Sequence, residues 1–286
     1  RHSPPERLLE QISFLLETQD ARHFFIVDDL FGQQRDETIR FCNMLRDYQK
    51  SIGRRLGITV QIRLDKAQDS ELLSAMRQAG ISVVAIGLES PIDEELKAMN
   101  KHIKSEDMAA FIKIFHKFGF LVHGMFIFGY PLKGGSHFKM SAKERVKRFR
   151  QFIRKAKIDT IQVLLACPLP GTELRHRLTA QNRIYSIQDV GWEYYDGNFP
   201  LFEPDEPMSA EEMQASVRKI MGKFYQFNYM FMIGLNIFSF PALIFFLHNV
   251  KLGWRKWYRT WRNTLARFGG WIIMRKWTAQ FKKDSF

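Results

Sequence analysis

Short apolar segments alternate with helical patterns along most of this 286-residue chain. The apolar segments lie at residues 24–27, 59–63, 82–88, 121–128 and 160–166. No hairpin signal joins two neighbouring segments, and strands that alternate with helices form parallel sheets with right-handed crossovers. The alternation therefore predicts an α/β fold built on one parallel sheet.

Apolar residues at helical spacing predict the connecting helices. They are expected over about 37–56, 70–79, 105–118 and 142–156, and another is expected to start with Ser209 as its N-cap. The first helix follows Ser3-Pro4-Pro5-Glu6, where we expect Ser3 to be the N-cap of a capping box. The continuous apolar run from Phe24 to Val27 is typical of a strand that is buried on both faces.

Five such units fit either a doubly wound sheet or part of a barrel. No glycine-rich phosphate loop follows the first strand, which argues against a dinucleotide-binding fold. In parallel βα folds, ligands bind at the carboxyl ends of the strands. Polar residues and glycine follow several of the predicted strands, and these are the first site candidates: Asp28, Asp29, Arg63, Glu89, Ser90 and Gly129.

The first three candidates have structural alternatives. Asp28 and Asp29 could bind a cationic amine or a metal, or one could cap the next turn while the other is solvated. Arg63 could bind a ligand carboxylate through its planar guanidinium group, or pair with Asp65. Spacing alone leaves these alternatives open.

The later candidates have alternatives too. Glu89 could accept hydrogen bonds from ribose hydroxyls, whereas Ser90 is a good N-cap for a helix that begins near Pro91. Gly124 and Gly129 flank the residues from Met125 to Phe128 and would allow a ligand to approach the backbone, or would simply permit tight packing. We expect His123 to make a structural hydrogen bond rather than to bind a metal.

The order of these motifs is more specific than any one of them. In sequence they are FIVDDLF (25–31), VQIR (60–63), IGLES (86–90), LKAMNK (96–101), HGMFIFG (123–129) and PLPGT (168–172). As a set, they resemble the radical S-adenosylmethionine superfamily, and most of all the branch with an N-terminal cobalamin-binding domain. The resemblance covers residues from about Ser3 to about Tyr225.

The resemblance implies a partial parallel (βα)6 TIM-like barrel, here lacking its first strand, plus a helical C-terminal tail. We expect a barrel domain over residues 1–207 and a tail over residues 208–286. The expected cofactors are S-adenosylmethionine, a [4Fe-4S] cluster and cobalamin. The reaction would be radical generation or methyl transfer to an unreactive carbon, with flavodoxin or ferredoxin as the electron donor.

The resemblance also gives the candidate residues their roles. Asp28 and Asp29 would meet the methionine amino group of S-adenosylmethionine, and Arg63 its carboxylate. Glu89 and Ser90 would lie near the ribose. The adenosine would lie along Met125, Phe126 and Gly129, with Leu165 packed on adenine.

The cluster-binding CxxxCxxC motif of that family is absent, and the only cysteines are Cys42 and Cys167. Holding a [4Fe-4S] cluster with one open iron takes three thiolates. We therefore expect that the first strand and cluster loop precede this sequence, and that the chain alone neither binds the cluster nor cleaves S-adenosylmethionine. The alternative is a non-catalytic adaptor at a membrane surface that is derived from such a barrel.

The tail has a composition of its own. Residues 229–247 are almost wholly apolar, and the basic, tryptophan-rich sequence that follows has no acid from Lys251 to Lys283. This pattern, with a net charge of +13, favours an anionic membrane surface and a small-molecule or lipid-like substrate. We expect a cytoplasmic protein at the inner face of a membrane. Nucleic acid is disfavoured, because no recognisable nucleic-acid-binding fold is present.

Overall fold

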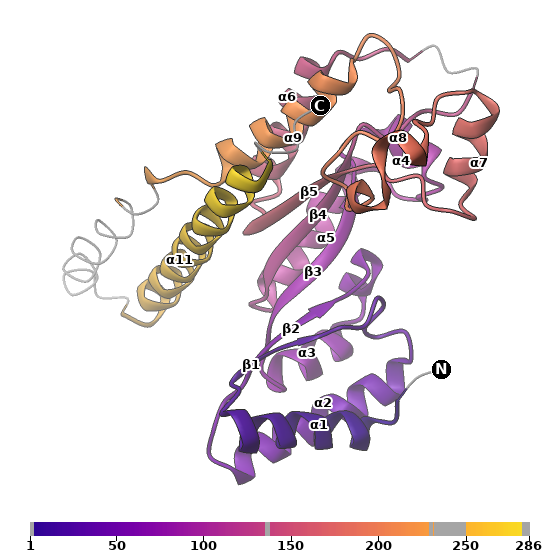
Figure 1. Cartoon of the computed structure of the whole chain (residues 1–286). Coiled ribbons are helices and arrows are strands. Elements are labelled where there is room, and N and C mark those ends of the chain that lie inside the picture. Colours follow the sequence, from indigo (N-terminus) through magenta and orange to yellow (C-terminus); the bar gives the residue numbers. More distant parts are fainter. Residues whose placement is uncertain (1–2, 135–137, 229–230, 232–249, 282–286) are drawn as a thin grey trace. The chain divides into compact units, whose positions relative to one another are not determined.

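The computed structural model describes residues 3–134, 138–228, 231 and 250–281. One five-stranded sheet follows the order of the sequence: β1 (His23–Ile26), β2 (Gly57–Gln61), β3 (Ile81–Glu89), β4 (Leu121–Phe128) and β5 (Thr160–Leu165). The pairs β1–β2 and β2–β3 are parallel, and helices connect successive strands (Figure 1). The α/β fold of the partial-barrel type is thus confirmed.

Before β4 the helices are α1 (Pro5–Gln19), α2 (Arg35–Ser51), η1 (Leu64–Gln68), α3 (Ser70–Gln78), α4 (Asp93–Ala98) and α5 (Ser105–Lys117). After β4 they are α6 (Ala142–Lys155), α7 (Glu173–Ala180), α8 (Ile187–Val190), η2 (Trp192–Tyr194), α9 (Ala210–Phe224) and α11 (Val250–Phe281). Helices α1, α2, α3, α5, α6 and α9 lie where the sequence predicted them, and the shorter helices other than α4, together with α11, were not predicted individually.

Two helix ends differ from the prediction. The helix expected over 37–56 ends at Ser51, because Gly53 takes a positive φ of 63° and its N–H bonds back to Lys50. The expected capping box at Ser3 is wrong. Pro4 takes the N-cap position and α1 has no side-chain cap, so Ser3 lies one residue too early.

The chain forms two compact units, which are described separately. The first contains Arg1–Leu88, Glu106–Met125 and Lys155–Ile158. The second contains Glu89–Ser105, Phe126–Arg154 and Asp159–Phe286.

In the first unit, α2 and α3 pack together, and buried apolar side chains fill the core under β2 and β3. Asp69 joins the two helices: it caps α3 at the Leu72 N–H and pairs with Arg35 of α2 at 2.7 Å. Arg35 holds the pKa of Asp69 below its usual value.

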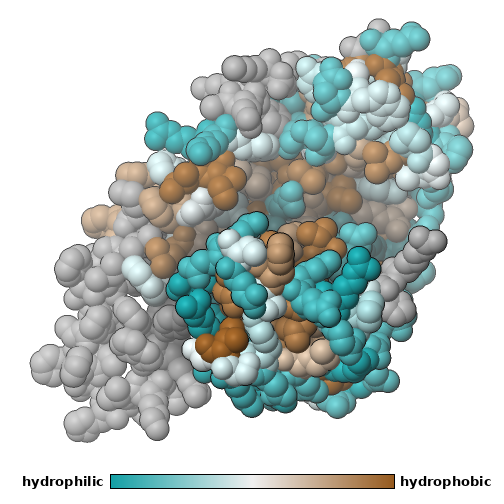
Figure 2. All heavy atoms as spheres, turned by 60° about the horizontal axis from the view of Figure 1, so that its bottom comes forward, coloured by the Kyte–Doolittle hydropathy of each residue, from teal (hydrophilic) through white to brown (hydrophobic). Residues whose placement is uncertain are grey.

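Strand β1 is more exposed than predicted. Phe25 and Val27 are 55% and 85% exposed, so the prediction of a strand buried on both faces is wrong. The reason is that β1 is the edge strand of the sheet. Figure 2 brings this unit forward and shows brown hydrophobic patches among the teal hydrophilic residues.

In the second unit, alternate residues of β4 pack against α6. The rings of Phe126 and Phe128 lie 5.3–6.2 Å from those of Phe149 and Phe152. Because side chains alternate across a strand, this face of β4 belongs to the helix layer.

The opposite edge strand, β5, is covered. The Tyr225 hydroxyl accepts from the N–H of Ile161 at 2.8 Å and donates to its carbonyl at 2.7 Å. Helix α9 begins with the predicted Ser209, which forms a capping box with Glu212. Further on, α11 packs against both α9 and β5.

The apolar segment 229–247 lies outside the described residues, apart from Phe231. Within the described part of the chain, no helix combines the length and the hydropathy that crossing a bilayer requires.

Candidate functional site

Asp28 and Asp29 follow β1 and are both exposed. The Asp28 carboxylate accepts the N–H of Leu30 at 3.2 Å, which is the capping role of the structural alternative. The loop is fixed to the end of β2, since Phe31 donates to the Gln61 carbonyl at 3.0 Å. Two carboxylates are therefore presented to solvent on an anchored backbone.

Arg63 lies just past β2, which ends two residues earlier than predicted, at Gln61. Its guanidinium group donates to both oxygens of Asp65 at 2.8 and 3.1 Å, as the structural alternative predicted. Both side chains are more than half exposed, so the pair contributes little to stability. A ligand carboxylate can compete for Arg63 at small cost.

Glu89 ends β3 in an unusual backbone conformation. Its φ of 61° lies in the left-handed region, which costs a residue other than glycine of the order of 1–3 kcal/mol and must be held by its surroundings. Its carboxylate is 18% exposed and accepts from Lys101 at 3.0 Å. A partly shielded carboxylate thus stands at the carboxyl end of a central strand.

Ser90, the next residue in the chain after Glu89, belongs to a buried polar cluster. Ser90, Glu95 and Arg145 are each at most 1% exposed. The Ser90 hydroxyl donates to Glu95 and accepts the N–H of Ile92 at 3.1 Å. Glu95 also pairs with Arg145 of α6. The end of β3 is therefore tied to α4 and α6 by fully buried groups.

The role of Ser90 differs from the prediction. Helix α4 begins at Asp93 rather than near Pro91, and its N-cap is Ile92. Ser90 therefore lies outside the helix and bonds the N–H of the N-cap residue itself.

Glu95 and Arg145 were not among the predicted residues, although the sequence holds a signal for Arg145. Arg145 lies at helical spacing among the apolar residues Ala142, Val146 and Phe149 of α6, all of which are buried. A charge on the buried face of an amphipathic helix requires a buried partner. Burial lowers the pKa of Arg145, whose charge is met by Glu95.

The predicted residues on β4 and β5 point to two faces. Phe126 and Leu165 are buried, Phe126 against the rings of α6, and the Leu165 N–H donates to Gly197 at 2.7 Å. Met125 lies on the opposite face of β4 and is half-buried. The Met125 side chain therefore points away from the face of β4 that packs against α6.

At Gly129 the structure shows the tight packing that the structural alternative predicted. Its φ is +74°, and an added Cβ would lie 2.4 Å from the sulfur of Met213. The loop beyond it is clamped from two sides. Arg177 of α7 donates to the Pro131 carbonyl at 3.1 Å, and Asp205 accepts the Leu132 N–H at 2.7 Å.

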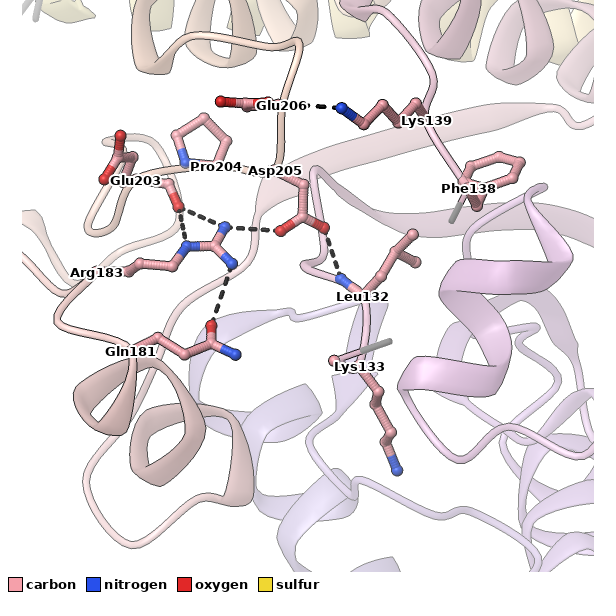
Figure 3. A pocket seen from close by; sticks show the side chains of 11 residues that line it. Leu132, Lys133, Phe138, Lys139, Gln181, Arg183, Glu203, Pro204, Asp205 and Glu206 are labelled. Carbon is pink, nitrogen blue, oxygen red and sulfur yellow. Dashed lines mark hydrogen bonds and ion pairs between the residues drawn. The ribbon is translucent and has the colours of Figure 1, made fainter. Parts of the chain in front are cut away.

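The same loop forms one wall of a cavity of about 370 Å³, which sequence reasoning missed (Figure 3). Its lining comes from distant parts of the sequence: Leu132, Lys133, Gly134, Phe138, Lys139, Gln181, Arg183, Glu203, Pro204, Asp205 and Glu206. Arg183 donates to the Glu203 carbonyl and to Asp205, and Lys139 lies 3.6 Å from Glu206. Most of the charges in the cavity thus already have protein partners.

The cysteines do not fit an iron–sulfur cluster. Cys42 is buried on α2, and burial raises the pKa of its thiol to about 12. Cys167 donates to the Tyr195 carbonyl, and burial raises the pKa of its thiol to about 11. Two protonated thiols in two different units cannot supply the three thiolates that the cluster requires. Among the described residues, no group of His, Cys, Asp and Glu could hold a metal ion.

Taken group by group, the polar side chains after the strands carry charges and acceptors that are complementary to those of S-adenosylmethionine. Its methionine end carries an ammonium and a carboxylate, which match the exposed carboxylates of Asp28 and Asp29 and the guanidinium group of Arg63. Its ribose hydroxyls match an acceptor such as Glu89.

No family model matches the chain. Among curated proteins, it is 26% identical over 220 residues to an uncharacterized methyltransferase of Pyrococcus horikoshii, covering 77% of this chain and 44% of that protein. It is 25% identical over 185 residues to the hopanoid C-2 methylase of Rhodopseudomonas palustris, covering 64% of this chain and 34% of that protein. The chain thus spans less than half the length of these relatives.

Among solved structures, the chain is similar to the cobalamin-dependent S-adenosylmethionine radical enzyme OxsB with aqua-cobalamin bound. The TM-score is 0.54 at 13% identity, and the match covers 99% of this chain and 51% of that one. At this identity the likeness shows a shared fold. The two curated relatives named above are called a methyltransferase and a methylase.

Proposed function

We propose that this chain, which is related to the cobalamin-binding branch of the radical S-adenosylmethionine enzymes, forms the part of such an enzyme that binds S-adenosylmethionine. The observation that carries the proposal is Glu89, a strained and partly shielded carboxylate at the end of β3. Strain of this kind persists where the surroundings enforce it and gathers at ligand sites. We infer that the buried cluster of Ser90, Glu95 and Arg145, which begins at the next residue, holds Glu89 in this conformation.

The proposed contacts follow the chemistry of each group. Asp28 and Asp29 bind the ammonium of the methionine end, and Arg63 exchanges Asp65 for the ligand carboxylate. Glu89 accepts hydrogen bonds from the ribose hydroxyls, and Ser90 positions Glu89. Met125 and the backbone near Phe126, Gly129 and Leu165 meet the adenosine.

The activity proposed for the complete enzyme is methyl transfer to an unreactive carbon. When bound, S-adenosylmethionine supplies the methyl group. The relative named hopanoid C-2 methylase supports an apolar, carbon-rich substrate. Because the cysteines of this chain do not fit the cluster, we assign its residues to binding and positioning and not to radical generation.

The test is equilibrium dialysis of the purified chain against labelled S-adenosylmethionine. We expect saturable binding that falls roughly tenfold or more in Glu89→Gln and in the double variant Asp28→Asn/Asp29→Asn, because each loses charge-assisted hydrogen bonds. Asp47→Asn, on the exposed side of α2, is the matched control and should bind like the wild type.

Absence of saturable binding by the wild-type chain would refute the proposal and favour the non-catalytic adaptor. Binding that survives all three substitutions would place the ligand elsewhere, with the cavity of Figure 3 as the next candidate.

A further inference from the structure

Helix α11 has an inner face that fixes its rotation about its own axis. Asn263 donates to the Asp159 carboxylate, and Arg267 donates to the Asp159 carbonyl at 3.0 Å. One turn further, Gly270 lies so close to Tyr225 that an added Cβ would stand 2.3 Å from its ring. Met274 continues the same face and is buried. The spacing of 263, 267, 270 and 274 is that of one helix face.

The opposite, outer face is apolar where a surface helix is normally polar. Leu265, Ile272 and Ile273 are 41%, 43% and 69% exposed. Leu265 and Ile272 are seven residues apart and lie on one line along the helix. Arg275 and Lys276, both exposed, flank them. Bulky aliphatic side chains and cations thus share the outer face.

The charge of the helix has one sign. Between Val250 and Phe281 there are eight basic residues, five tryptophans and no acid. On the flank of the helix, Phe227 is 55% exposed, and its ring lies 5.0 Å from that of Trp271. Aromatic and basic residues together are typical of the interface between water and a bilayer.

Exposed aliphatic side chains and basic residues on one helix face favour one kind of binding partner over the others. A second copy of this chain could cover the apolar side chains, but it would bring like charges together. Nucleic acid could neutralise the positive charge, but it would not bury the exposed Leu and Ile side chains. A surface of anionic lipid satisfies both features, because aliphatic side chains enter the acyl boundary while basic ones meet the headgroups.

We propose that the outer face of α11 is a membrane-docking surface for anionic lipid, with the helix lying parallel to the bilayer and its inner face bound to its own protein. This inference rests on the tail alone and does not depend on the S-adenosylmethionine proposal.

The test is co-sedimentation of the full chain with vesicles of phosphatidylcholine and phosphatidylglycerol, compared with vesicles of phosphatidylcholine alone. We expect binding to the anionic vesicles that weakens with added salt. Ile272→Glu/Ile273→Glu should lower the partition coefficient roughly tenfold per residue. Arg275→Gln/Lys276→Gln should lower it roughly 30-fold on anionic vesicles alone.

The matched control is Phe14→Glu, which removes an equally exposed apolar side chain from α1 and should leave binding unchanged. Circular dichroism and light scattering establish that each variant is folded and report its oligomeric state. Binding that is unchanged in both double variants, or equal on neutral vesicles, would overturn the proposal. So would a wild-type chain that does not sediment but forms a dimer that the Ile272→Glu/Ile273→Glu variant loses.

Discussion

The ends of β1 and β2 hold their polar residues differently from the end of β3. Asp28 and Arg63 are exposed, and each bonds to a group two positions away. Ser90 is fully buried and is linked through Glu95 to Arg145 of another helix. The first arrangement leaves charged groups free to exchange partners, whereas the second fixes the backbone next to Glu89 through buried polar groups. The first kind of residue suits a group that changes partners when a ligand binds, and the second kind suits a group that is held in one place.

The largest effect on stability is expected from the buried residues after β3. Arg145→Ala leaves Glu95 as an unpaired buried charge and should lower the free energy of unfolding by roughly 3–5 kcal/mol, measured by urea denaturation. Arg148→Ala, one turn along α6 and exposed, is the control and should change little. If the double variant Arg145→Ala/Glu95→Ala were no more stable than Arg145→Ala, the unpaired charge would not be the cause.

The next effect concerns the thiols. With a pKa near 11, Cys167 carries roughly 100-fold less thiolate than a free cysteine, and Cys42 carries less still. We expect both to react with Ellman's reagent at pH 8 at least this much more slowly in the native chain than in urea. Rapid native reaction of either thiol would contradict the burial described and reopen the question of cluster ligation.

A smaller effect is expected from Ser90→Ala. Glu95 loses one hydrogen bond in a buried setting, which should cost roughly 1–3 kcal/mol of unfolding free energy. Because Ser90 positions Glu89, the affinity for S-adenosylmethionine should fall as well, and Ser90→Thr should restore part of it. A loss of stability with unchanged affinity would separate the buried cluster from the ligand site.

The smallest effect on stability is expected from the exposed residues after β2. Arg63→Ala and Asp65→Ala should each change the free energy of unfolding by no more than about 1 kcal/mol, since the pair is exposed. Dialysis should nevertheless tell them apart: Arg63→Ala weakens S-adenosylmethionine binding, whereas Asp65→Ala does not. If the two variants bound S-adenosylmethionine equally well, Arg63 would pair with Asp65 without contacting the ligand.

The sequence predicted the parallel sheet and most of the element boundaries, because strand and helix periodicities are local properties. It also placed the polar residues after the strands and offered the pairing of Arg63 with Asp65 as one of two alternatives. It did not predict the exposure of β1, because an edge strand and a central strand can share the same apolar run. Nor did it predict the partnership of Glu95 with Arg145, which depends on how α4 and α6 pack.

The most direct test of the account is S-adenosylmethionine binding by the purified chain before and after anaerobic treatment with iron and sulfide. The account predicts saturable binding with the same affinity in both samples, and no retained iron or cluster absorbance, because Cys42 and Cys167 cannot supply the thiolates. Bound iron near the content of a [4Fe-4S] cluster, or the absence of saturable binding in both samples, would contradict it.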